Sequence, residues 1–384
     1  MNTTDKTKDQ TSSRDKVLLL LESRKGCYVS GQEIASELGL SRTAVWKAVR
    51  KLKNEGFEID AVTNRGYCLP VDYDVLSAEK IYESIADIVS DRVVDTGIYA
   101  DRAFLAGTRH FNMDSLNIKV FDTIDSTNAF CMRMASEGAP GGLIAVAGSQ
   151  SRGRGRRGRT FFSPEGTGLY LSILLRPSGL SSKPAMRFTT IAAVAVSEAI
   201  EAVSGRKAEI KWVNDIYVDG LKVCGILTEA SFDLEDYTLA YAVVGIGINV
   251  YEPEEGFPEV IKDVAGAVSP YHKGEDNIND PVLKNGGRNR LAAEIITRFY
   301  SYCVAELNSQ YSSTPTPGLD VKRYIDEYRR RCFVIGREID VLIAGSAPVK
   351  AYVTGLDDEC GLNVVYEDGS SETLSSGEIS IRLQ

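Results

Sequence analysis

Four arginines and three glycines alternate along residues 153–159, a mixture suited to binding an anion. The segment reads Gly153-Arg154-Gly155-Arg156-Arg157-Gly158-Arg159, and Arg152 adds a fifth cation. Guanidinium groups bind phosphate or carboxylate through paired hydrogen bonds, and glycines let the backbone come close to a ligand. The whole chain has a formal net charge of −9. Because a local excess of positive charge is costly to hold without a counter-ion, we predict that this segment binds an anion.

The glycine spacing also matches a dinucleotide-binding turn, but the residues that follow do not. That turn needs a helix directly after its last glycine, whereas Thr160-Phe161-Phe162-Ser163-Pro164 follows here. A disordered nucleic-acid-binding tract is a second alternative, and a solvated basic loop is a third. Apolar, strand-like runs at residues 143–147 and 169–175 flank the segment. They favour a loop between two buried strands.

A second cationic motif lies at residues 211–227, which contain Lys211 and Lys222. Asp219-Gly220 between alternating runs predicts a β-hairpin, so we expect the two lysines to lie on paired strands and converge on one site. With Asn214-Asp215 beside them, they suit a nucleotide whose phosphates gain charge during a reaction. Considered alone, such lysines are more often exposed strand residues.

Two further segments place polar groups or glycines at the ends of predicted elements. Asp125-Ser126-Thr127-Asn128 is typical of a helix N-terminus, and its hydroxyls and amide could hydrogen-bond a polar ligand. As a helix cap only, it would be unremarkable. Gly245-Ile246-Gly247-Ile248-Asn249 ends an apolar run, where glycines permit close approach of the backbone.

Residues 14–72 predict a compact unit of three helices and a hairpin. The capping box at residues 30–33 begins a second helix that ends at Gly39, and Ser41 caps the third. The short turn between these two helices is typical of a helix-turn-helix. Alternating runs around a turn over residues 57–69 predict a hairpin, which would be the wing.

The third helix carries five basic residues and one acid, Glu55. This charge pattern is typical of a recognition helix whose N-terminal residues contact bases in the major groove of DNA. Arg65 at the hairpin tip suits a phosphate contact. The alternative is a helical pair that merely packs, with solvated lysines. The predicted DNA-binding residues are Ser41, Arg42, Thr43, Trp46, Lys47, Arg50 and Arg65.

Composition and cysteine spacing argue against several classes of protein. The 384 residues suffice for two or three domains, with an apolar content of 43% and a charged content of 25% that are ordinary for soluble proteins. No apolar run approaches the roughly 20 residues of a membrane span, and the polar segment Met1 to Asp15 lacks a signal-peptide core, so we expect a cytoplasmic protein without a membrane partner. Seven scattered cysteines without CxxC spacing support neither disulfides nor a zinc site. Two histidines, His110 and His272, lack catalytic context.

The remaining chain predicts a large mixed α/β region followed by a small β unit. Residues 266–290 are polar and rich in Gly, Asn and Asp, which predicts a surface excursion. A helix is expected over residues 321–331. From residue 334 onward, short alternating runs separated by turns predict a small β-barrel of about five strands.

These motifs, in this order, resemble those of the bifunctional biotin protein ligases that also repress the biotin operon. The resemblance covers nearly everything after residue 13. It implies an α+β fold with an N-terminal winged helix-turn-helix, a central class-II-synthetase-like mixed α/β catalytic domain and a small C-terminal SH3-like β-barrel. The implied bounds are a flexible tail at residues 1–13, the DNA-binding domain at 14–72, the catalytic domain at 73–330 and the barrel at 331–384.

The resemblance also implies a two-step reaction and its partners. Biotin and ATP would form biotinyl-5′-AMP, with Mg²⁺ bound mainly through ATP, and biotin would then pass to a lysine of the biotin carboxyl carrier domain of acetyl-CoA carboxylase. A liganded homodimer would bind the biotin operator DNA. Biotin would be bound by Ser126, Thr127, Asn128, Gln150, Arg154, Gly155, Arg156 and Lys222. The adenylate or ATP would be bound by Arg157, Arg159, Phe161, Lys211, Asn214, Asp215 and Asn249. Arg156, Lys222 and Lys211 would be catalytic.

The chain departs from the family pattern at three places. Val213 replaces a common proline, which is expected to loosen the backbone there, and segments 96–115 and 266–290 are longer than usual. A lipoate-type ligase is one alternative, but its glycine-rich, histidine-containing signature is absent. A biotin-sensing transcription factor with little ligase activity is another, and retention of the arginine and lysine set argues against it. A pure nucleic-acid protein would need a broader basic surface than a pI near 5.1 suggests.

Overall fold

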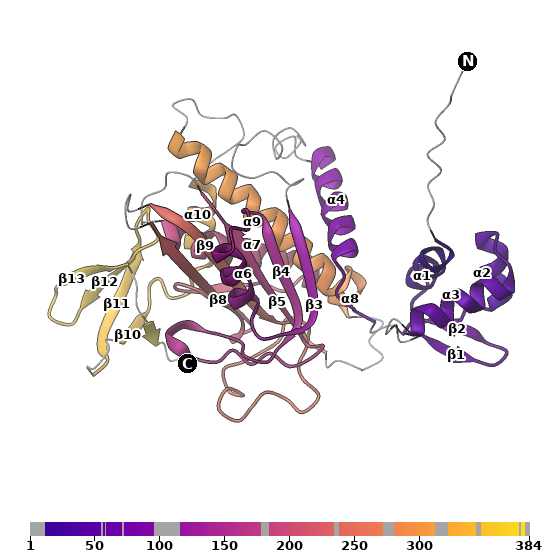
Figure 1. The fold of residues 1–384 in the computed structure, drawn as a ribbon. Helices are drawn as coiled ribbons and strands as arrows, with labels where there is room; N and C mark the ends of the chain where they lie inside the picture. Colours follow the sequence, from indigo (N-terminus) through magenta and orange to yellow (C-terminus); the bar gives the residue numbers. More distant parts are fainter. Residues whose placement is uncertain are drawn as a thin grey trace, which may run out of the picture. The chain divides into compact units, whose positions relative to one another are not determined.

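The computed structural model describes residues 12–54, 57, 59–70, 73–95, 116–177, 184–233, 238–271, 280–311, 322–342, 347–375 and 378–380. Both histidines and the whole of segment 96–115, expected to be unusually long, lie outside these residues. The chain forms two compact units, one ending at Asp74 and the other beginning at Val75 (Figure 1). Each unit has its own buried core.

In its described residues, the N-terminal unit has three helices and a two-stranded hairpin, as predicted. Its elements are α1 (Ser13–Ser23), α2 (Gly31–Leu38), α3 (Arg42–Asn54), β1 (Asp60–Val62) and β2 (Gly66–Cys68). The Ser30 hydroxyl accepts a hydrogen bond from the Glu33 amide at 3.1 Å, and Gly39 ends α2 with a φ of 65°. Ser41 caps α3 by accepting from the Ala44 amide. Buried aliphatic side chains, among them Leu21, hold the three helices together.

The second unit is built on one central sheet. In the described residues its strands follow the order β3-β4-β5-β9-β8-β7-β6. Only β3 and β4 are parallel to each other, and the other neighbouring strands are antiparallel. The strands are β3 (Asn117–Ile124), β4 (Leu143–Gln150), β5 (Gly168–Leu175), β6 (Glu209–Lys211), β7 (Asp215–Val218), β8 (Leu221–Phe232) and β9 (Leu239–Asn249).

Helices cover both faces of this sheet (Figure 1). Alternate residues of β4 point to opposite sides: Ile144 joins the main core, whereas Ala145 joins a smaller core beneath α6 (Thr127–Ser136). This explains why β4 and β5 are apolar at nearly every position. The main core lies under α4 (Ala78–Asp95), α7 (Pro184–Ser204) and α9 (Gly287–Tyr311). The described residues also contain α8 (Pro281–Lys284) and α10 (Lys322–Arg331).

The prediction of a surface excursion over residues 266–290 is wrong at both ends of that segment. Val268, Asp280 and Arg288 are buried, and α9 begins at Gly287. The polar residues there serve the fold: Asp280 accepts from the Val282 amide and the Ser269 hydroxyl, and Arg288 donates to the Gly168 carbonyl. Buried polar groups need such partners, so a polar composition did not mean exposure.

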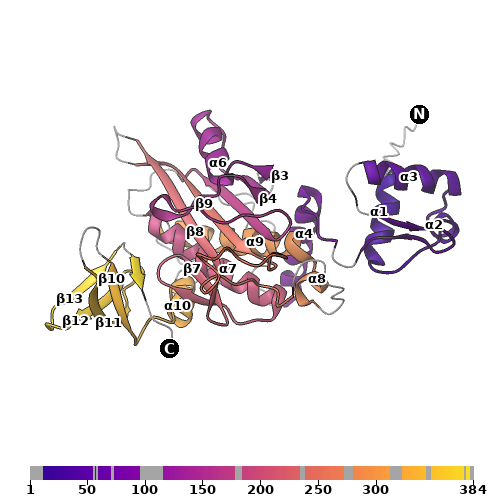
Figure 2. The same ribbon diagram turned by 90° about the horizontal axis from the view of Figure 1, so that it is seen from below.

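The C-terminal part is a small antiparallel sheet of five strands in the described residues, in the order β13-β12-β11-β10-β14. The number of strands agrees with the prediction. The strands are β10 (Glu338–Leu342), β11 (Val349–Leu356), β12 (Leu362–Tyr366), β13 (Ser371–Leu374) and β14 (Glu378–Ser380). Helix α10 leads into this sheet (Figure 2). Among the described residues, no helix has the length and apolarity that a membrane crossing requires.

Candidate active site

The arginine–glycine loop connects β4 to β5, two buried neighbouring strands, as the flanking apolar runs predicted. No helix of α type follows it; Arg156–Gly158 forms one short 3₁₀ turn. Two backbone hydrogen bonds stabilise the loop: the Gly155 amide donates to the Arg159 carbonyl at 2.7 Å, and the Phe161 amide donates to the Gly153 carbonyl at 3.0 Å. A Cβ atom on Gly153 would overlap the Phe161 carbonyl, so this glycine is required for the close approach.

A small polar pocket of about 20 Å³ lies at one end of the loop. Ser126 caps α6 through a hydrogen bond from the Ala129 amide, and Gln150 Oε1 accepts from the Thr127 amide at 2.9 Å. The buried Ser172 hydroxyl donates to Asn128 Oδ1 at 2.6 Å. The pocket is lined by Ser126, Thr127, Asn128, Gln150, Arg154, Phe161, Gly225, Leu227, Gly245, Ile246 and Gly247.

A larger pocket of about 380 Å³ lies along the rest of the loop. Arg156 donates to Asn214 Oδ1 at 2.8 Å, and Lys222 Nζ lies 2.6 Å from Asp215 Oδ1. Asn249 Nδ2 donates to the Gly266 carbonyl. The predicted residues that line this pocket are Arg154, Gly155, Arg156, Arg157, Arg159, Phe161, Lys211, Asn214, Asp215, Lys222 and Asn249. The two pockets therefore bring together every residue predicted for biotin or the nucleotide.

The two lysines converge as expected, but by a different strand arrangement. Asp219-Gly220 does join β7 to β8 in a hairpin, with Lys222 opposite Tyr217. Lys211 lies on β6, where it pairs with Asp215 of β7. The prediction that the lysines lie on strands paired with each other is wrong, because the short strand β7 runs between them.

The pockets share part of their walls, namely Arg154, Phe161, Gly225 and Leu227. Where they share walls, the two pockets form one passage. The register of β8 and β9 lines this passage by setting Gly225 opposite Gly247 and Leu227 opposite Gly245. A Cβ atom on Gly247 would lie 2.8 Å from the Phe161 ring. Glycines at these positions leave the space in which the ring packs.

Sequence reasoning missed several residues of the site. Glu229 Oε1 lies 2.9 Å from Arg154 Nη2, and its Oε2 accepts from Asn128 Nδ2 at 3.0 Å. Gly225, Leu227 and Glu229 are alternate residues of β8, and alternate residues of a strand lie on the same face of the sheet. This spacing could have predicted that Glu229 faces the site. The pocket-lining residues Ile261 and Val264 follow β9, and Ile379 comes from β14 in the C-terminal sheet. No local pattern marked these three.

The site offers cations and amides but no activated nucleophile among its described residues. Burial raises the pKa of the Cys224 thiol far above its usual value and that of the Tyr217 hydroxyl to about 12. In the described part of the chain, no three His, Cys, Asp or Glu side chains cluster as a metal site. Asp215 is the carboxylate in the lining of the larger pocket, and Lys222 neutralises it.

In the N-terminal unit, all seven predicted DNA-binding residues are exposed. The Arg50 guanidinium lies 5.3 Å from the centre of the Trp46 ring, which is on the same side of α3. At the hairpin tip, Arg65 lies 4.2 Å from the centre of the Tyr28 ring. These cation–π contacts hold both arginines at the surface of the unit.

Comparisons with known proteins cover both units. A model of the biotin/lipoate A/B protein ligase family matches residues 120–249, a model of an HTH domain matches residues 13–68, and a model of the biotin protein ligase C-terminal domain matches residues 334–382. The bifunctional ligase/repressor BirA of Bacillus spizizenii is 36% identical over 67% of this chain and 71% of its own length. BirA of Salmonella typhimurium is 28% identical over 98% of this chain and 99% of its own. A structure of biotin protein ligase from Aquifex aeolicus in complex with biotin and ATP aligns with a TM-score of 0.52 and 26% identity, covering 70% of this chain and 99% of that one.

Proposed function

This chain belongs to the family of bifunctional biotin protein ligases and repressors, and from this premise we propose that it activates biotin with ATP and transfers biotin to a lysine of a carrier protein. The observation that carries the proposal is the shared wall of the two pockets. Because the pockets adjoin, one ligand could place a neutral polar head in the small pocket and a phosphate among the cations of the larger pocket. The passage between them is where a carboxylate and an α-phosphate would meet.

The small pocket suits the ureido head of biotin. That group presents two N–H donors and one carbonyl acceptor, and Ser126, Thr127, Asn128 and Gln150 supply both kinds of partner. A bound analogue that lacks these groups would leave polar groups of the pocket unpaired, and this cost makes such a pocket selective. Arg154 at the rim would point the carboxylate of biotin toward the larger pocket.

In the first step, a carboxylate oxygen of biotin would attack the α-phosphorus of ATP. The new oxygen–phosphorus bond forms as the bond to pyrophosphate breaks. The reaction brings two anions together, so the main task of the protein is electrostatic: Arg156, Lys211 and Lys222 would offset the repulsion and the charge of the transition state. This assignment agrees with a site that holds cations rather than a nucleophile.

Mg²⁺ fits this site as an ion carried by ATP. Among the described residues that line the larger pocket, Asp215 is the one carboxylate, and the Asn214 amide lies beside it. Mg²⁺ commonly takes one or two protein oxygens and completes its shell with phosphates and water. Bound there, it would shield the charges of the phosphates.

In the second step, the amine of an acceptor lysine would attack the acyl carbon of biotinyl-5′-AMP. An amide bond forms, AMP leaves, and the amine loses a proton. Water would compete in this step, since a mixed anhydride hydrolyses readily, and the arginine–glycine loop would exclude it by covering the adenylate. The proposed acceptor is the biotin carboxyl carrier domain of acetyl-CoA carboxylase.

Pyrophosphate exchange tests the ligase proposal directly. We expect the purified chain to exchange labelled pyrophosphate into ATP only when biotin is present, and lipoate not to replace biotin. Labelling of a purified carrier domain, with its acceptor lysine changed to arginine as the control, tests the second step. Absence of biotin-dependent exchange from the folded chain contradicts the proposal.

The exposed basic face of α3 supports a second activity, repression of biotin genes. Ser41 caps α3, and Arg42, Thr43 and Lys47 lie in the N-terminal half of the helix, where a recognition helix contacts bases. One copy offers a single helix, so two copies held as a homodimer would bind a two-fold operator far better. We propose that biotinyl-5′-AMP favours this dimer and thereby raises operator affinity, and that an unmodified acceptor reverses it by consuming the adenylate.

A further inference from the structure

The segment of residues 208–214 brings Lys211 and Asn214 to the larger pocket. Hydrogen bonds connect this segment to the C-terminal part of the chain. The Phe333 amide donates to the Ile210 carbonyl at 3.1 Å, and Trp212 Nε1 donates to the Cys360 carbonyl at 2.9 Å. Phe333 lies two residues beyond the end of α10, and Cys360 lies between β11 and β12. The segment is therefore bonded to the C-terminal part of the chain on both sides of Lys211.

Tyr328 of α10 adds a contact at the residue that precedes Asn214. Its hydroxyl donates to the Val213 carbonyl at 3.0 Å, and the Tyr328 side chain is fully buried. Val213 stands where a proline was expected, and it is also buried. The next residue, Asn214, accepts from Arg156 of the arginine–glycine loop. Tyr328 thus lies one peptide away from a contact that joins the segment to the loop.

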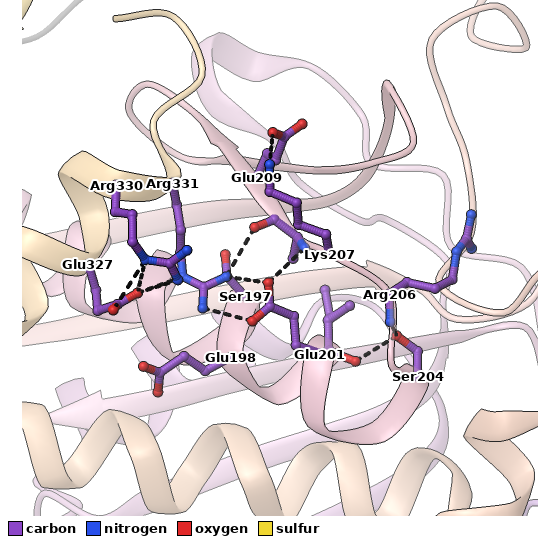
Figure 3. A network of polar contacts seen from close by, with 12 residues as sticks. Ser197, Glu198, Glu201, Ser204, Arg206, Lys207, Glu209, Glu327, Arg330 and Arg331 are labelled. Carbon is purple, nitrogen blue, oxygen red and sulfur yellow. Dashed lines mark hydrogen bonds and ion pairs between the residues drawn. The ribbon is translucent and has the colours of Figure 1, made fainter.

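Arg331 fastens the other end of the segment (Figure 3). Its Nη1 donates to the Ala208 carbonyl at 3.1 Å, and its two Nη atoms lie 2.6 and 2.8 Å from the carboxylate oxygens of Glu201 on α7. Glu327 accepts from Arg331 Nε at 3.2 Å. The Arg331 side chain is only 5% exposed. Glu201 is partly exposed, so the cost of changing Arg331 comes mainly from its own buried side chain and from the hydrogen bonds that the change removes.

We propose that Tyr328 and Arg331 are positioning residues for the nucleotide pocket: by fixing residues 208–214 against α7 and the C-terminal sheet, they set the places of Lys211 and Asn214. Ile379 of the C-terminal sheet lines the same pocket, so this part of the chain is one wall of the nucleotide site. The small polar pocket is lined from α6, β4, β8, β9 and the loop in the described residues. Losing the contacts of Tyr328 and Arg331 should therefore weaken ATP binding more than biotin binding. The inference rests on the proposed ligase function.

The first test is Tyr328→Phe, which removes one hydroxyl and keeps the ring. One hydrogen bond contributes about 1 kcal/mol, so we expect the KM for ATP to rise about fivefold in biotin-dependent pyrophosphate exchange. The KM for biotin should stay within about twofold of wild type, as should its Kd measured by calorimetry without ATP. Unchanged KM for ATP, or an equal rise in both KM values, overturns the proposal.

Arg331→Leu tests the contacts of Arg331 with Ala208 and Glu201, and Arg331→Lys and Arg330→Ala are the matched variants. Arg330 is the neighbouring arginine and also binds Glu327, but its side chain is 57% exposed. We expect a rise of about tenfold or more in the KM for ATP with Arg331→Leu, partial recovery with Arg331→Lys and no change with Arg330→Ala. If Arg331→Leu does not fold, the result with Tyr328→Phe decides the matter.

Failure of this inference can be told from failure of the proposed function. Wild-type protein that lacks biotin-dependent exchange contradicts the function. Wild-type protein that exchanges normally, together with a Tyr328→Phe protein of unchanged KM for ATP, contradicts the positioning role alone. Binding of a non-hydrolysable ATP analogue in the presence of biotin gives a readout that is independent of turnover, and it should weaken about fivefold in Tyr328→Phe.

Discussion

At the scale of single residues, the polar side chains of the candidate site already have partners within the protein. Asp215 holds Lys222, Asn214 holds Arg156, and Glu229 holds Arg154. A cation fixed in this way needs little rearrangement when charge develops on a phosphate, and this preorganisation is the main source of electrostatic catalysis. The pairings also imply that each cation can be removed individually with a defined effect.

Lys222→Met should impair formation of the adenylate, because methionine keeps the length of the side chain but removes the charge where carboxylate and α-phosphate meet. Loss of one such group costs about 100-fold or more in rate, which we expect in pyrophosphate exchange. Lys119→Met, at an exposed lysine of β3, is the control and should leave exchange unchanged. Wild-type exchange by a folded Lys222→Met protein would remove this lysine from the proposed mechanism.

Arg156→Ala should shorten the half-life of bound biotinyl-5′-AMP. A hydrogen bond to a charged group contributes about 1.5–3 kcal/mol, so release measured by rapid dilution should be at least about tenfold faster. The melting temperature should barely change, since Arg156 lies in a loop and is only half-buried. Arg152→Ala, at an exposed arginine beside the loop, should release the adenylate at the wild-type rate. An unchanged half-life in Arg156→Ala contradicts the role of Arg156.

At the scale of helices and strands, local patterns predicted where the elements lie in the sequence better than which elements lie next to each other in the fold. The capping residues Ser30 and Ser126 and the turn at Asp219-Gly220 were found because each acts within a few residues. The position of β7 between the two lysine-bearing strands depends on pairing across the sheet, which periodicity does not encode. Ile379, about 130 residues beyond Asn249, reaches the same pocket only through the packing of the C-terminal sheet.

The fastening between α7 and α10 should weaken in acid. Burial acts to raise the pKa of the Glu201 carboxyl, but hydrogen bonds from Arg331 and the Ala208 amide outweigh it and lower the pKa below the usual 4.5. A lowered carboxyl pKa stabilises the fold above the usual value and loses this effect as the pH falls through the lowered value. The melting temperature of Arg331→Leu should therefore lie below that of wild type at pH 7, and the gap should narrow below about pH 4.5. A gap that is constant from pH 7 to pH 3 contradicts this account, and Arg330→Ala serves as the control.

At the scale of the whole molecule, two units with separate cores carry the two proposed activities. The exposed cations of α3 and the two pockets belong to different units. In the proposed mechanism, biotin therefore affects DNA binding through the association of two copies. By thermodynamic linkage, a ligand that favours the dimer raises operator affinity, and operator DNA favours the liganded dimer to the same extent.

Footprinting at one fixed salt concentration tests this coupling. We expect operator occupancy to require at least about tenfold less protein when biotin and ATP are present, and sedimentation to show a larger species under the same conditions. Salt must be held constant because phosphate contacts make affinity depend on it. A protein that lacks residues 1–72 should lose operator binding and keep most pyrophosphate exchange. Equal operator affinity with and without the ligands contradicts the coupling.

The pairing of β8 with β9 also governs which insertions and deletions the chain tolerates. Gly225 and Gly247 face each other in this ladder, and so do Leu227 and Gly245. One residue added or removed within the ladder would turn every following side chain to the opposite face of the sheet. The hairpin end, where the ladder already shifts register between Ser231 and Phe232, lies beyond the pocket and can absorb such changes. Variation in length among natural or engineered versions of this chain should therefore gather at that end of the hairpin and be absent between Cys224 and Ala230.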